Sequence, residues 1–412
     1  MTRRVFLIPL LISLTLTIGG CSQEIPAGIA DTVNELLVSS DAGSLESEAD
    51  DTIDTVETVP SEDISGGFWY RQLSEEQQSV YTELYTAAAN RENTTTVSVS
   101  SDDDIAYCLT AMMNDHPELF WLDGSASYSG FPGSSARSVT MNFNVDVSEI
   151  DEIQDQIDAA VSDYLSTLSA DPDEYEIVRR AYRYIIANTD YDSSAPMNQN
   201  IQSVFLYGRS VCSGYAKAFM YLVKSAGIDD VGYITGTAAI NESAQPEGHS
   251  WNVVAINGTY TLVDVTWGDP TYAQEEGVAS AGAAYISYDY LCLTEDELNR
   301  DGHITDSGIS LPDCSSTEYD YYRYVGAYFE DFDYDELYSY MLNLLQSGDR
   351  NILMKFSDSD SFEAARRNLF EAEDSLMSDM LQEYMSYADL ANIHYEYTMN
   401  DRLYIIKITV SG

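Results

Sequence analysis

The sequence of 412 residues contains few basic residues. Only 19 Lys and Arg stand against 69 Asp and Glu, so the formal net charge is −50. A nucleic-acid backbone would be repelled by this charge, which excludes nucleic-acid binding, and an anionic membrane surface would be repelled as well. The acidity is typical of a well-solvated exterior, and a dedicated site for basic substrates is the alternative.

Cysteine and histidine are also scarce. The four histidines are scattered, no Cys-x-x-Cys occurs, and the acidic run Asp102–Asp104 lacks the spacing of a calcium loop. We therefore expect no metal and no cofactor. Among the five cysteines, Cys108, Cys292 and Cys314 can form at most one disulfide, and our choice of pair is Cys292 with Cys314.

The N-terminal apolar run is too short for a comfortable membrane span. Phe6–Ile18 follows Arg3 and Arg4, which is the layout of a secretory signal peptide. The run ends in Ile18-Gly-Gly-Cys21, which resembles a bacterial lipoprotein box. We expect cleavage before Cys21, lipidation of Cys21 and an extracytoplasmic protein held at a cell membrane by its lipid. Ordinary cleavage near Gly19 is the alternative, and the kind of membrane stays open.

The rest of the chain divides by composition and pattern. Residues 22–67 hold few large apolar side chains, so they cannot offset their chain entropy and are expected to be a disordered acidic linker. The remaining length suffices for two or three domains. We predict the signal peptide, the linker, an N-terminal α+β module, a catalytic domain and a C-terminal α+β module at 1–21, 22–67, 68–147, 148–314 and 315–412.

Hydrophobic periodicity predicts the elements of the two flanking modules. In the N-terminal module it predicts a helix with a Ser74/Gln77 capping box at 74–90, a strand at 96–99, a helix at 102–114 and strands at 118–122 and 138–145. Helices at 149–168 and 173–188 follow. In the C-terminal module it predicts a helix at 334–345, a strand at 352–356, one long helix at 361–384 and a hairpin, 393–399 with 403–410, turning at Asn400-Asp401. The order strand, helix, strand, strand occurs in both modules, so a duplicated module is a hypothesis, although the residues hardly match.

Cys212 is predicted to open a helix. Apolar residues from Tyr215 to Val223 form a broad stripe, and Gly227 is suited to end the helix after Ala226. The free amides and positive dipole of a helix N-terminus favour a thiolate and offer donors to a developing oxyanion. The alternative for any single cysteine is a buried structural residue.

His249 and Asp264 flank a predicted hairpin. Residues 250–256 and 259–267 are rich in β-forming residues and are joined by Asn257-Gly258, a strong signal for a two-residue turn. With that turn Ile256 opposes Thr259, so His249 and Asp264 become diagonal neighbours on one face of the hairpin. A slip of one residue would separate them. The register therefore predicts a base and orienter pair.

The segment from about Ser203 to Pro270 resembles the transglutaminase-like superfamily of papain-related cysteine enzymes. The matching motifs are Gly208-x-x-x-Cys212-x-Gly-Tyr-Ala216, Ala226-Gly-Ile228, Gly236, His249-x-Trp-Asn252 and Asp264-Val-Thr-Trp267. The region from Tyr288 to His303 is similar to the usual end of bacterial members. The resemblance implies an α+β core in which a nucleophile helix packs on an antiparallel sheet, with Cys212 as nucleophile, His249 as general base and acid, and Asp264 as orienter.

Other positions near the motifs are weaker candidates. Gln202 and Tyr207 are candidates for a second oxyanion donor, each with a structural role as the alternative. Trp251 and Trp267 are candidates to line the site that holds the acyl group, and the alternative is that they are ordinary aromatic residues of the core. Ser213 stands where the family often has an acidic or amide residue, a departure that we expect to be harmless.

The predicted function is acyl transfer through a thioester. The Cys212 thiolate would attack an amide of a protein or peptide at the cell surface, and water or an amine would resolve the thioester. We favour hydrolysis slightly, because water needs no second binding site. The competing hypothesis is a non-catalytic surface lipoprotein that keeps the fold to bind or hold a ligand. A serine hydrolase using Ser210 or Ser213 lacks a nucleophile elbow. A monomer, anchored in the bilayer by its lipid, is expected.

Overall fold

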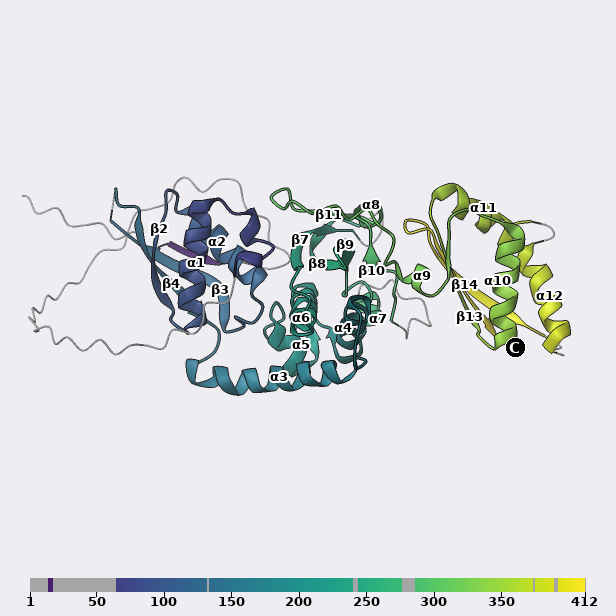
Figure 1. The fold of residues 1–412 in the computed structure, drawn as a ribbon, viewed down its shortest axis with the longest axis horizontal. Helices are drawn as coiled ribbons and strands as arrows, with labels where there is room; N and C mark the ends of the chain where they lie inside the picture. Colours follow the sequence, from purple (N-terminus) through teal and green to yellow (C-terminus); the bar gives the residue numbers. More distant parts are fainter. Residues whose placement is uncertain are drawn as a thin grey trace, which may run out of the picture.

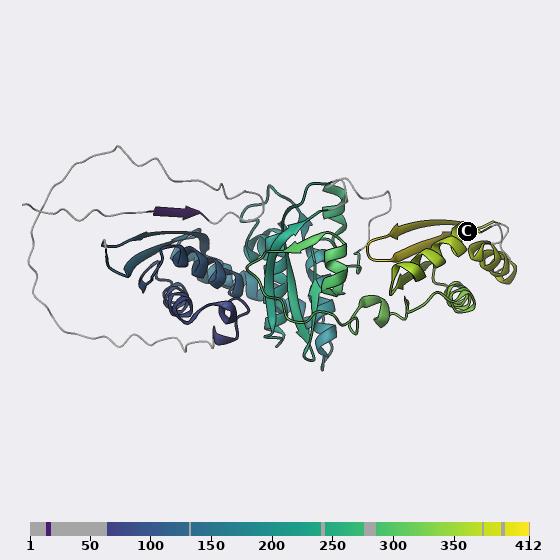
Figure 2. The same ribbon diagram turned by 90° about the horizontal axis from the view of Figure 1, so that it is seen from above.

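The computed structural model describes residues 14–17, 64–131, 133–239, 244–275, 286–372, 375–388 and 392–411. They form three bodies that follow one another along the long axis (Figure 1), and the view from above shows the same row (Figure 2). Cys21 and residues 22–63 of the predicted linker lie outside the described residues. Among the described helices, none is long and apolar enough to cross a membrane. The predicted domain boundaries stay predictions.

The N-terminal body pairs two helices with a four-stranded sheet in the order β1-β3-β4-β2. Its elements are β1 (Leu14–Thr17), η1 (Ile64–Gly66), η2 (Tyr70–Gln72), α1 (Glu75–Ala89), β2 (Thr94–Ser98), α2 (Asp103–Asp115), β3 (Leu122–Ser129) and β4 (Ala136–Phe143). The predicted Ser74/Gln77 capping box is present. Strand β1 belongs to the segment that the sequence predicts to be removed, and cleavage at Cys21 would leave β3 at the edge of the sheet.

The strand predicted at 118–122 is wrong. Strand β3 begins at Leu122 and continues through small and polar residues to Ser129. These residues carry little hydrophobic alternation, and the pairing of β3 with β4 shifts register between Leu122 and Ala126. The pattern that marks a regular half-buried strand is therefore missing from the sequence.

The central body contains an antiparallel sheet in the order β10-β9-β8-β7-β11. Its helices are η3 (Val147–Glu149), α3 (Ile150–Ser166), α4 (Glu174–Asn188), α5 (Ile201–Tyr207), α6 (Cys212–Ser225), α7 (Pro270–Glu275) and α8 (Glu295–Arg300). Its strands are β5 (Asp190–Tyr191), β6 (Arg209–Ser210), β7 (Val231–Ala238), β8 (Glu247–Ile256), β9 (Thr259–Val263), β10 (Leu291–Leu293) and β11 (His303–Thr305). Helix α6 packs on β7 and β8 and is covered by α4 and α5 (Figure 1). The predicted helices at 149–168 and 173–188 are confirmed as α3 and α4.

The C-terminal body has a sheet in the order β12-β13-β15-β14. Helix α9 (Tyr321–Tyr324) lies in the segment that connects this body to the central one. The other elements are β12 (Tyr328–Phe329), α10 (Tyr334–Ser347), β13 (Asn351–Phe356), α11 (Ser359–Phe370), α12 (Leu376–Ala388), β14 (His394–Asn400) and β15 (Ile405–Ser411). The single helix predicted at 361–384 is two helices. Both bury one face in the same core, so their apolar periodicity gave no sign of the break. The hairpin turn is longer than predicted, because Asn400 pairs with Ile405 and its side chain accepts from the amides of Arg402 and Leu403.

The two flanking modules share one topology. In each, a helix and a strand are followed by a helical segment and then a two-strand hairpin, and the first strand pairs antiparallel with the last. This gives β2-β4-β3 in one module and β13-β15-β14 in the other. The shared strand order supports the duplication hypothesis at the level of topology.

The N-terminal module shares its hydrophobic core with the central domain. The Phe68 ring lies over Gly232 of β7, where an added Cβ would come within 2.5 Å of the ring. Trp69 donates from Nε1 to the Tyr233 carbonyl at 2.8 Å, and Lys224 of α6 donates to the Asp115 carbonyl at 3.0 Å. The module is therefore fixed against both the central sheet and the helix that begins at Cys212.

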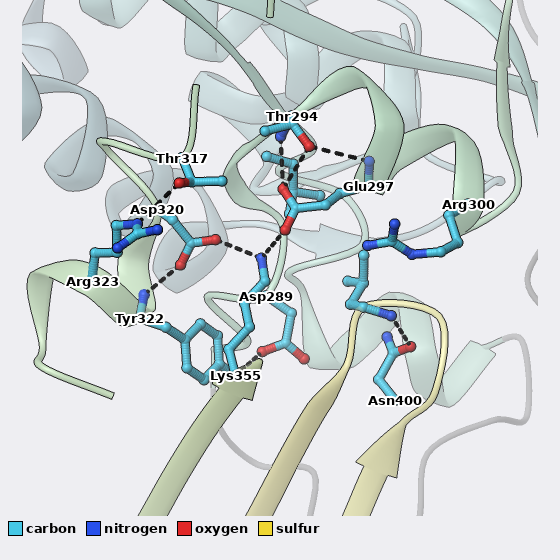
Figure 3. A network of polar contacts seen from close by, with 12 residues as sticks. Asp289, Thr294, Glu297, Arg300, Thr317, Asp320, Tyr322, Arg323, Lys355 and Asn400 are labelled. Carbon is cyan, nitrogen blue, oxygen red and sulfur yellow. Dashed lines mark hydrogen bonds and ion pairs between the residues drawn. The ribbon is translucent and has the colours of Figure 1, made fainter. Parts of the chain in front are cut away.

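The C-terminal module has a second core of its own, and it meets the central domain through apolar side chains such as Leu403 and Ile405 and through buried polar groups. Lys355 of β13 is buried and contacts Glu297 of α8 at 2.7 Å and Asp320 at 2.5 Å (Figure 3). Burial opposes the charges, but the two carboxylates raise the pKa of Lys355, and the ammonium holds the pKa of Glu297 below its usual value. Burial raises the pKa of Asp320 above its usual value despite the ammonium, so the charges of this joint depend on Lys355 staying paired.

A second part of the same joint surrounds Asp301. Arg402, in the β14–β15 turn, donates to the carbonyls of Asp301 at 2.6 Å and Ala239 at 3.0 Å. The Asp301 carboxyl is 2% exposed, and its Oδ2 has no hydrogen-bond partner among the described residues. Burial raises the pKa of Asp301 to about 7, although a hydrogen bond to Tyr290 and the charge of Arg402 act in the opposite direction.

The predicted disulfide between Cys292 and Cys314 is wrong, because Cys108, Cys292 and Cys314 are all unbridged. Closeness in sequence does not set the direction of the thiols, and Cys292 lies on β10 with a φ of +63°. Burial raises the pKa of Cys108 and Cys314 to about 12, and it raises the pKa of Cys292 well above its usual value. All three are therefore thiols of the interior.

Replacing Lys355 with Met should destabilise the protein by about 3–5 kcal/mol, because Glu297 and Asp320 would be left as buried unpaired charges. The matched control is Arg366→Met in the same module. Arg366 pairs with Glu363 and Glu371 on the surface, so its loss leaves no buried charge and the free energy of unfolding should stay close to that of wild type. Urea unfolding of both variants measures the difference, and equal losses would contradict the assignment.

Replacing Asp301 with Asn should stabilise the protein more at pH 8 than at pH 5. The raised pKa means that the folded state holds a proton that the unfolded state has released, so wild-type stability falls as the pH rises from about 4 to about 7. Asn removes this titration, and its advantage at pH 8 should reach roughly 2–4 kcal/mol. Melting temperatures of both proteins at the two pH values provide the measurement. A difference that does not change with pH would show that Asp301 does not titrate.

Candidate functional site

Cys212 is the first residue of helix α6, as the sequence predicts. The carbonyl of Val211, the N-cap, accepts from the amides of Gly214 at 2.9 Å and Tyr215 at 3.1 Å. The helix ends before Gly227, which has a φ of +99°. The first amides of a helix have no partner within the helix, so the thiol lies where an anion is favoured.

Gly214 allows the first turn of α6 to lie close to the chain that precedes it. An added Cβ there would come within 1.9 Å of the Ser210 Oγ and 3.1 Å of the Ser203 Oγ. Those two hydroxyls bond to each other at 2.5 Å, and Ser210 donates to the Asn198 carbonyl. Packing against this polar layer thus explains why a glycine stands two residues after Cys212.

The β8–β9 hairpin has the predicted register. Ile256 pairs with Thr259 and Asn252 with Val263, and the turn residues Asn257 and Gly258 have φ values of +49° and +81°. Asp264 follows the last residue of β9. His249 Nε2 lies 2.7 Å from Asp264 Oδ2, so the predicted neighbours form a hydrogen bond.

Helix α6 is fastened to strand β8 next to the two candidate residues. The Asn252 side chain donates from β8 to the Ala216 carbonyl of α6 at 3.0 Å. A chain of hydroxyls joins Ser213 to Tyr233 at 2.8 Å and Tyr233 to Ser250 at 2.7 Å. Ser213 follows Cys212 and Ser250 follows His249, so this chain ties the start of α6 to the part of β8 that carries the imidazole. The serine that departs from the family pattern is therefore part of the framework.

Asp264 accepts three hydrogen bonds in a fully buried position. Its Oδ1 accepts from the Trp267 amide at 3.1 Å, and its Oδ2 lies 2.7 Å from His249 Nε2 and 3.0 Å from His303 Nε2. Burial alone would raise the pKa of Asp264, but His249 and His303 outweigh it and hold the pKa well below its usual range. The carboxylate is thus ionised and fixed.

His303 is the residue that sequence reasoning missed. It comes from the short edge strand β11, which pairs with β7 through His303 and Ala238. A three-residue strand leaves little pattern, and its pairing partner lies more than sixty residues earlier. Two signals pointed to His303: two of the four histidines in the chain lie in this one cluster, and the region that ends at His303 resembles the usual end of bacterial family members.

Trp251 and Trp267 enclose the two imidazoles. The Trp251 ring lies 6.0 Å from that of His249 and 5.2 Å from that of His303, while Trp267 lies 5.7 Å and 4.4 Å away. Both indoles are buried. In the structure the two indoles contact the imidazoles of His249 and His303.

The side chains of His249, Asp264 and His303 could also bind a metal ion, because one ligand atom of each lies within 4.8 Å of the others. Two zinc ligands at about 2.0–2.1 Å in tetrahedral geometry are about 3.3 Å apart. The observed separations of 2.7 and 3.0 Å from Oδ2 are shorter and are those of hydrogen bonds. The spacing therefore indicates that the two imidazoles form hydrogen bonds to the Asp264 carboxylate.

The two weak candidates for an oxyanion donor lie elsewhere. Gln202 is buried and donates from Nε2 to the Phe120 carbonyl at 3.1 Å, in the joint with the N-terminal module. Tyr207 is the last residue of α5 and is 46% exposed. Gln202 thus stabilises the contact with the N-terminal module, and Tyr207 faces solvent. The position of neither residue supports a role as oxyanion donor.

A family model described as the transglutaminase-like superfamily matches residues 163–265. This match contains Cys212, His249 and Asp264. Residues 163–265 are a transglutaminase-like domain. Its α+β fold, a helix that begins at Cys212 and packs on an antiparallel sheet, is the one that the sequence predicts.

The transglutaminase-like domain is similar to curated and solved proteins over part of the chain. Kyphoscoliosis peptidase of Homo sapiens is 29% identical over 126 residues, which are 27% of this chain and 18% of that protein. The Mus musculus protein is 28% identical over 130 residues, 28% of this chain and 19% of that one. This chain thus spans less than a fifth of their length. A crystal structure of a TGase is 14% identical, with a TM-score of 0.25, and covers 34% of this chain and 43% of that one.

Gly236→Ala should disturb the transglutaminase-like domain. Gly236 pairs with His249, and an added Cβ would come within 2.6 Å of Trp251 Cη2 and 2.2 Å of the Ile304 carbonyl. We expect a loss of about 1–3 kcal/mol in stability from overpacking, with a further loss of activity because Trp251 would be displaced. Gly308→Ala, where nothing lies within 4 Å, is the control in a urea titration. Equal stability of the two variants would contradict the close contact.

Proposed function

We propose that the transglutaminase-like domain is a cysteine acyl enzyme that acts on peptide or protein amides. The hydrogen bond between His249 Nε2 and Asp264 Oδ2 carries this proposal. An ionised carboxylate only accepts, so Nε2 bears the proton and Nδ1 remains as the basic nitrogen. That is the arrangement an imidazole needs in order to take a proton from a thiol while a carboxylate fixes its tautomer.

The proposed reaction proceeds through a thioester. His249 takes the proton of Cys212, and the thiolate sulfur bonds to the substrate carbonyl carbon. The resulting oxyanion is stabilised by amides at the start of α6. As the C–N bond breaks, the imidazolium returns the proton to the leaving amine. A second nucleophile, deprotonated by His249, then attacks the thioester and releases Cys212.

Water is the favoured second nucleophile, which makes the reaction hydrolysis by a peptidase or amidase. A water molecule needs no binding site of its own, whereas transamidation requires a site for an amine and exclusion of water. The similarity to a protein named as a peptidase supports the same choice.

The alternative is a non-catalytic surface protein that retains the fold. The observation that favours it is burial, because Cys212 is 1% and His249 6% exposed. A substrate must reach both groups, and a scaffold needs no such access. The alternative leaves unexplained why an ionised carboxylate is held against the imidazole.

The protein is further proposed to act outside the cytoplasm as a lipid-anchored monomer. The basis is the sequence pattern around Cys21, which lies outside the described residues. The acidic segment between Cys21 and the N-terminal module would then act as a tether, and the substrate would be a protein or peptide at the cell surface.

Alkylation of the intact protein tests the nucleophile. At pH 6, iodoacetamide should modify Cys212 at least tenfold faster in wild type than in His249→Ala, because only the thiolate reacts. The three interior thiols have raised pKa values and provide an internal background in the same mass spectrum. Cys212→Ser should remove the fast modification and Cys108→Ala should not. Equal rates in wild type and His249→Ala would remove the basis for an enzyme.

Product analysis then identifies the second nucleophile. Wild type and Cys212→Ala are incubated with a peptide library, with and without a primary amine. Hydrolysis adds the mass of water across the cleaved amide, and transfer adds the mass of the amine less ammonia. We expect water addition that the amine does not suppress. Amine addition in its place would make the protein a transamidase, and an unchanged library would favour the scaffold.

A further inference from the structure

The Oδ2 atom of Asp264 has two imidazole partners, whereas the proposed reaction uses one. His303 Nε2 lies 3.0 Å from this oxygen, and the side chains of both residues are fully buried. The proposed reaction therefore assigns no role to the second donor, His303.

The protonation state of His303 follows from its surroundings. The groups facing it are the Asp264 carboxylate, the His249 imidazole, the indoles of Trp251 and Trp267, and the Leu298 carbonyl. Burial lowers its pKa most, His249 lowers it further, and Asp264 and Leu298 oppose the change without reversing it. His303 is thus neutral at pH 7, and its hydrogen bond to a carboxylate places its proton on Nε2.

The orientation of His303 is set by packing. The Trp267 ring lies 4.4 Å from the imidazole, and the Trp251 ring lies edge-on to it at 5.2 Å and 88°. The ring is therefore aimed by aromatic contacts on one side and by Asp264 on the other.

The strand that carries His303 is held by the C-terminal module. Arg402 donates to the carbonyls of Asp301 and Ala239, which lie at the start of β11 and the end of β7. Between them Gly302 has a φ of +104°, and an added Cβ would come within 2.9 Å of the Ala239 carbonyl and 3.0 Å of Arg402 Nη1. Arg402 thus closes the place where β11 joins the sheet, one residue before His303.

We propose that His303 is a positioning residue of the site: its Nε2–H fixes the Asp264 carboxylate for His249, and Arg402 of the C-terminal module holds the strand that carries it. In this role His303 acts through Asp264 and takes no part in bond making or breaking. This inference rests on the proposed function and gives the C-terminal module a part in it, because the module supports the orienter through β11.

Two substitutions at His303 separate donation from packing. His303→Phe keeps an aromatic ring between the indoles and removes the donor, whereas His303→Gln keeps an N–H at a similar distance from the backbone. In full-length protein, His303→Phe should lower the rate of Cys212 alkylation and kcat for peptide hydrolysis by about 10- to 100-fold with KM little changed. His303→Gln should recover most of the loss. Equal rates in all three proteins, or equal losses in both variants, would overturn the proposal.

The link to the C-terminal module is tested with Arg402→Met, which should show the same fall in kcat in a weaker form. Arg366→Met is the matched control, because Arg366 pairs only with Glu363 and Glu371 on the surface of the same module. If both variants keep the wild-type rate while His303→Phe does not, the role of Arg402 is refuted.

A spectroscopic readout distinguishes failure of this inference from failure of the proposed function. The four histidines make a ¹⁵N-histidine spectrum assignable. His303 should be neutral with its proton on Nε2 at pH 7, and the His249 Nε2–H signal should shift in His303→Phe and return in His303→Gln. An inert wild type with this pattern would refute the enzyme but retain the positioning. An active wild type whose His249 signal is the same in all three proteins would refute the positioning alone.

Discussion

The register of one two-residue turn is the constraint on which the site depends. Asn257 and Gly258 have positive φ values that fit such a turn, and they fix Ile256 opposite Thr259. From that pair outward, each step along β8 is matched by one along β9, and Asp264 arrives beside His249. Because side chains alternate between faces, a slip of one residue would turn one member of the pair away from the other. A local preference of the backbone thus decides a contact between an imidazole and a carboxylate.

Around this hairpin, the structure uses polar contacts to fix position and apolar contacts to exclude water. Asn252 and the hydroxyl chain from Ser213 to Ser250 bind α6 to the sheet, while Trp251 and Trp267 cover the imidazoles. The carboxylate of Asp264 has no contact with solvent, so its charge is balanced entirely by N–H donors. In such a site the loss of any one donor strongly destabilises the carboxylate, because no water can replace that donor.

The flanking modules meet the central domain in different ways despite their shared topology. The N-terminal module joins through a continuous apolar core, with Phe68 over Gly232. The C-terminal module adds buried polar contacts, in which Lys355 meets Glu297 and Asp320 (Figure 3). Arg402 also donates to the Asp301 carbonyl. Apolar contacts tolerate changes of pH, whereas buried ionisable groups do not. The buried ionisable groups of the C-terminal joint therefore give solution conditions a way to alter the support of the site.

The sequence by itself determined the local parts: the helix that begins at Cys212, the hairpin turn at Asn257-Gly258 and the capping box at Ser74. Each depends on neighbouring residues, whose dihedral preferences and periodicity are visible in a short window. Only the tertiary structure decided that His303 joins Asp264, that Gln202 serves a module joint, that β3 begins at Leu122 and that the cysteines stay unbridged. These outcomes depend on elements far apart in the chain, and packing between such elements leaves no periodic trace in either of them.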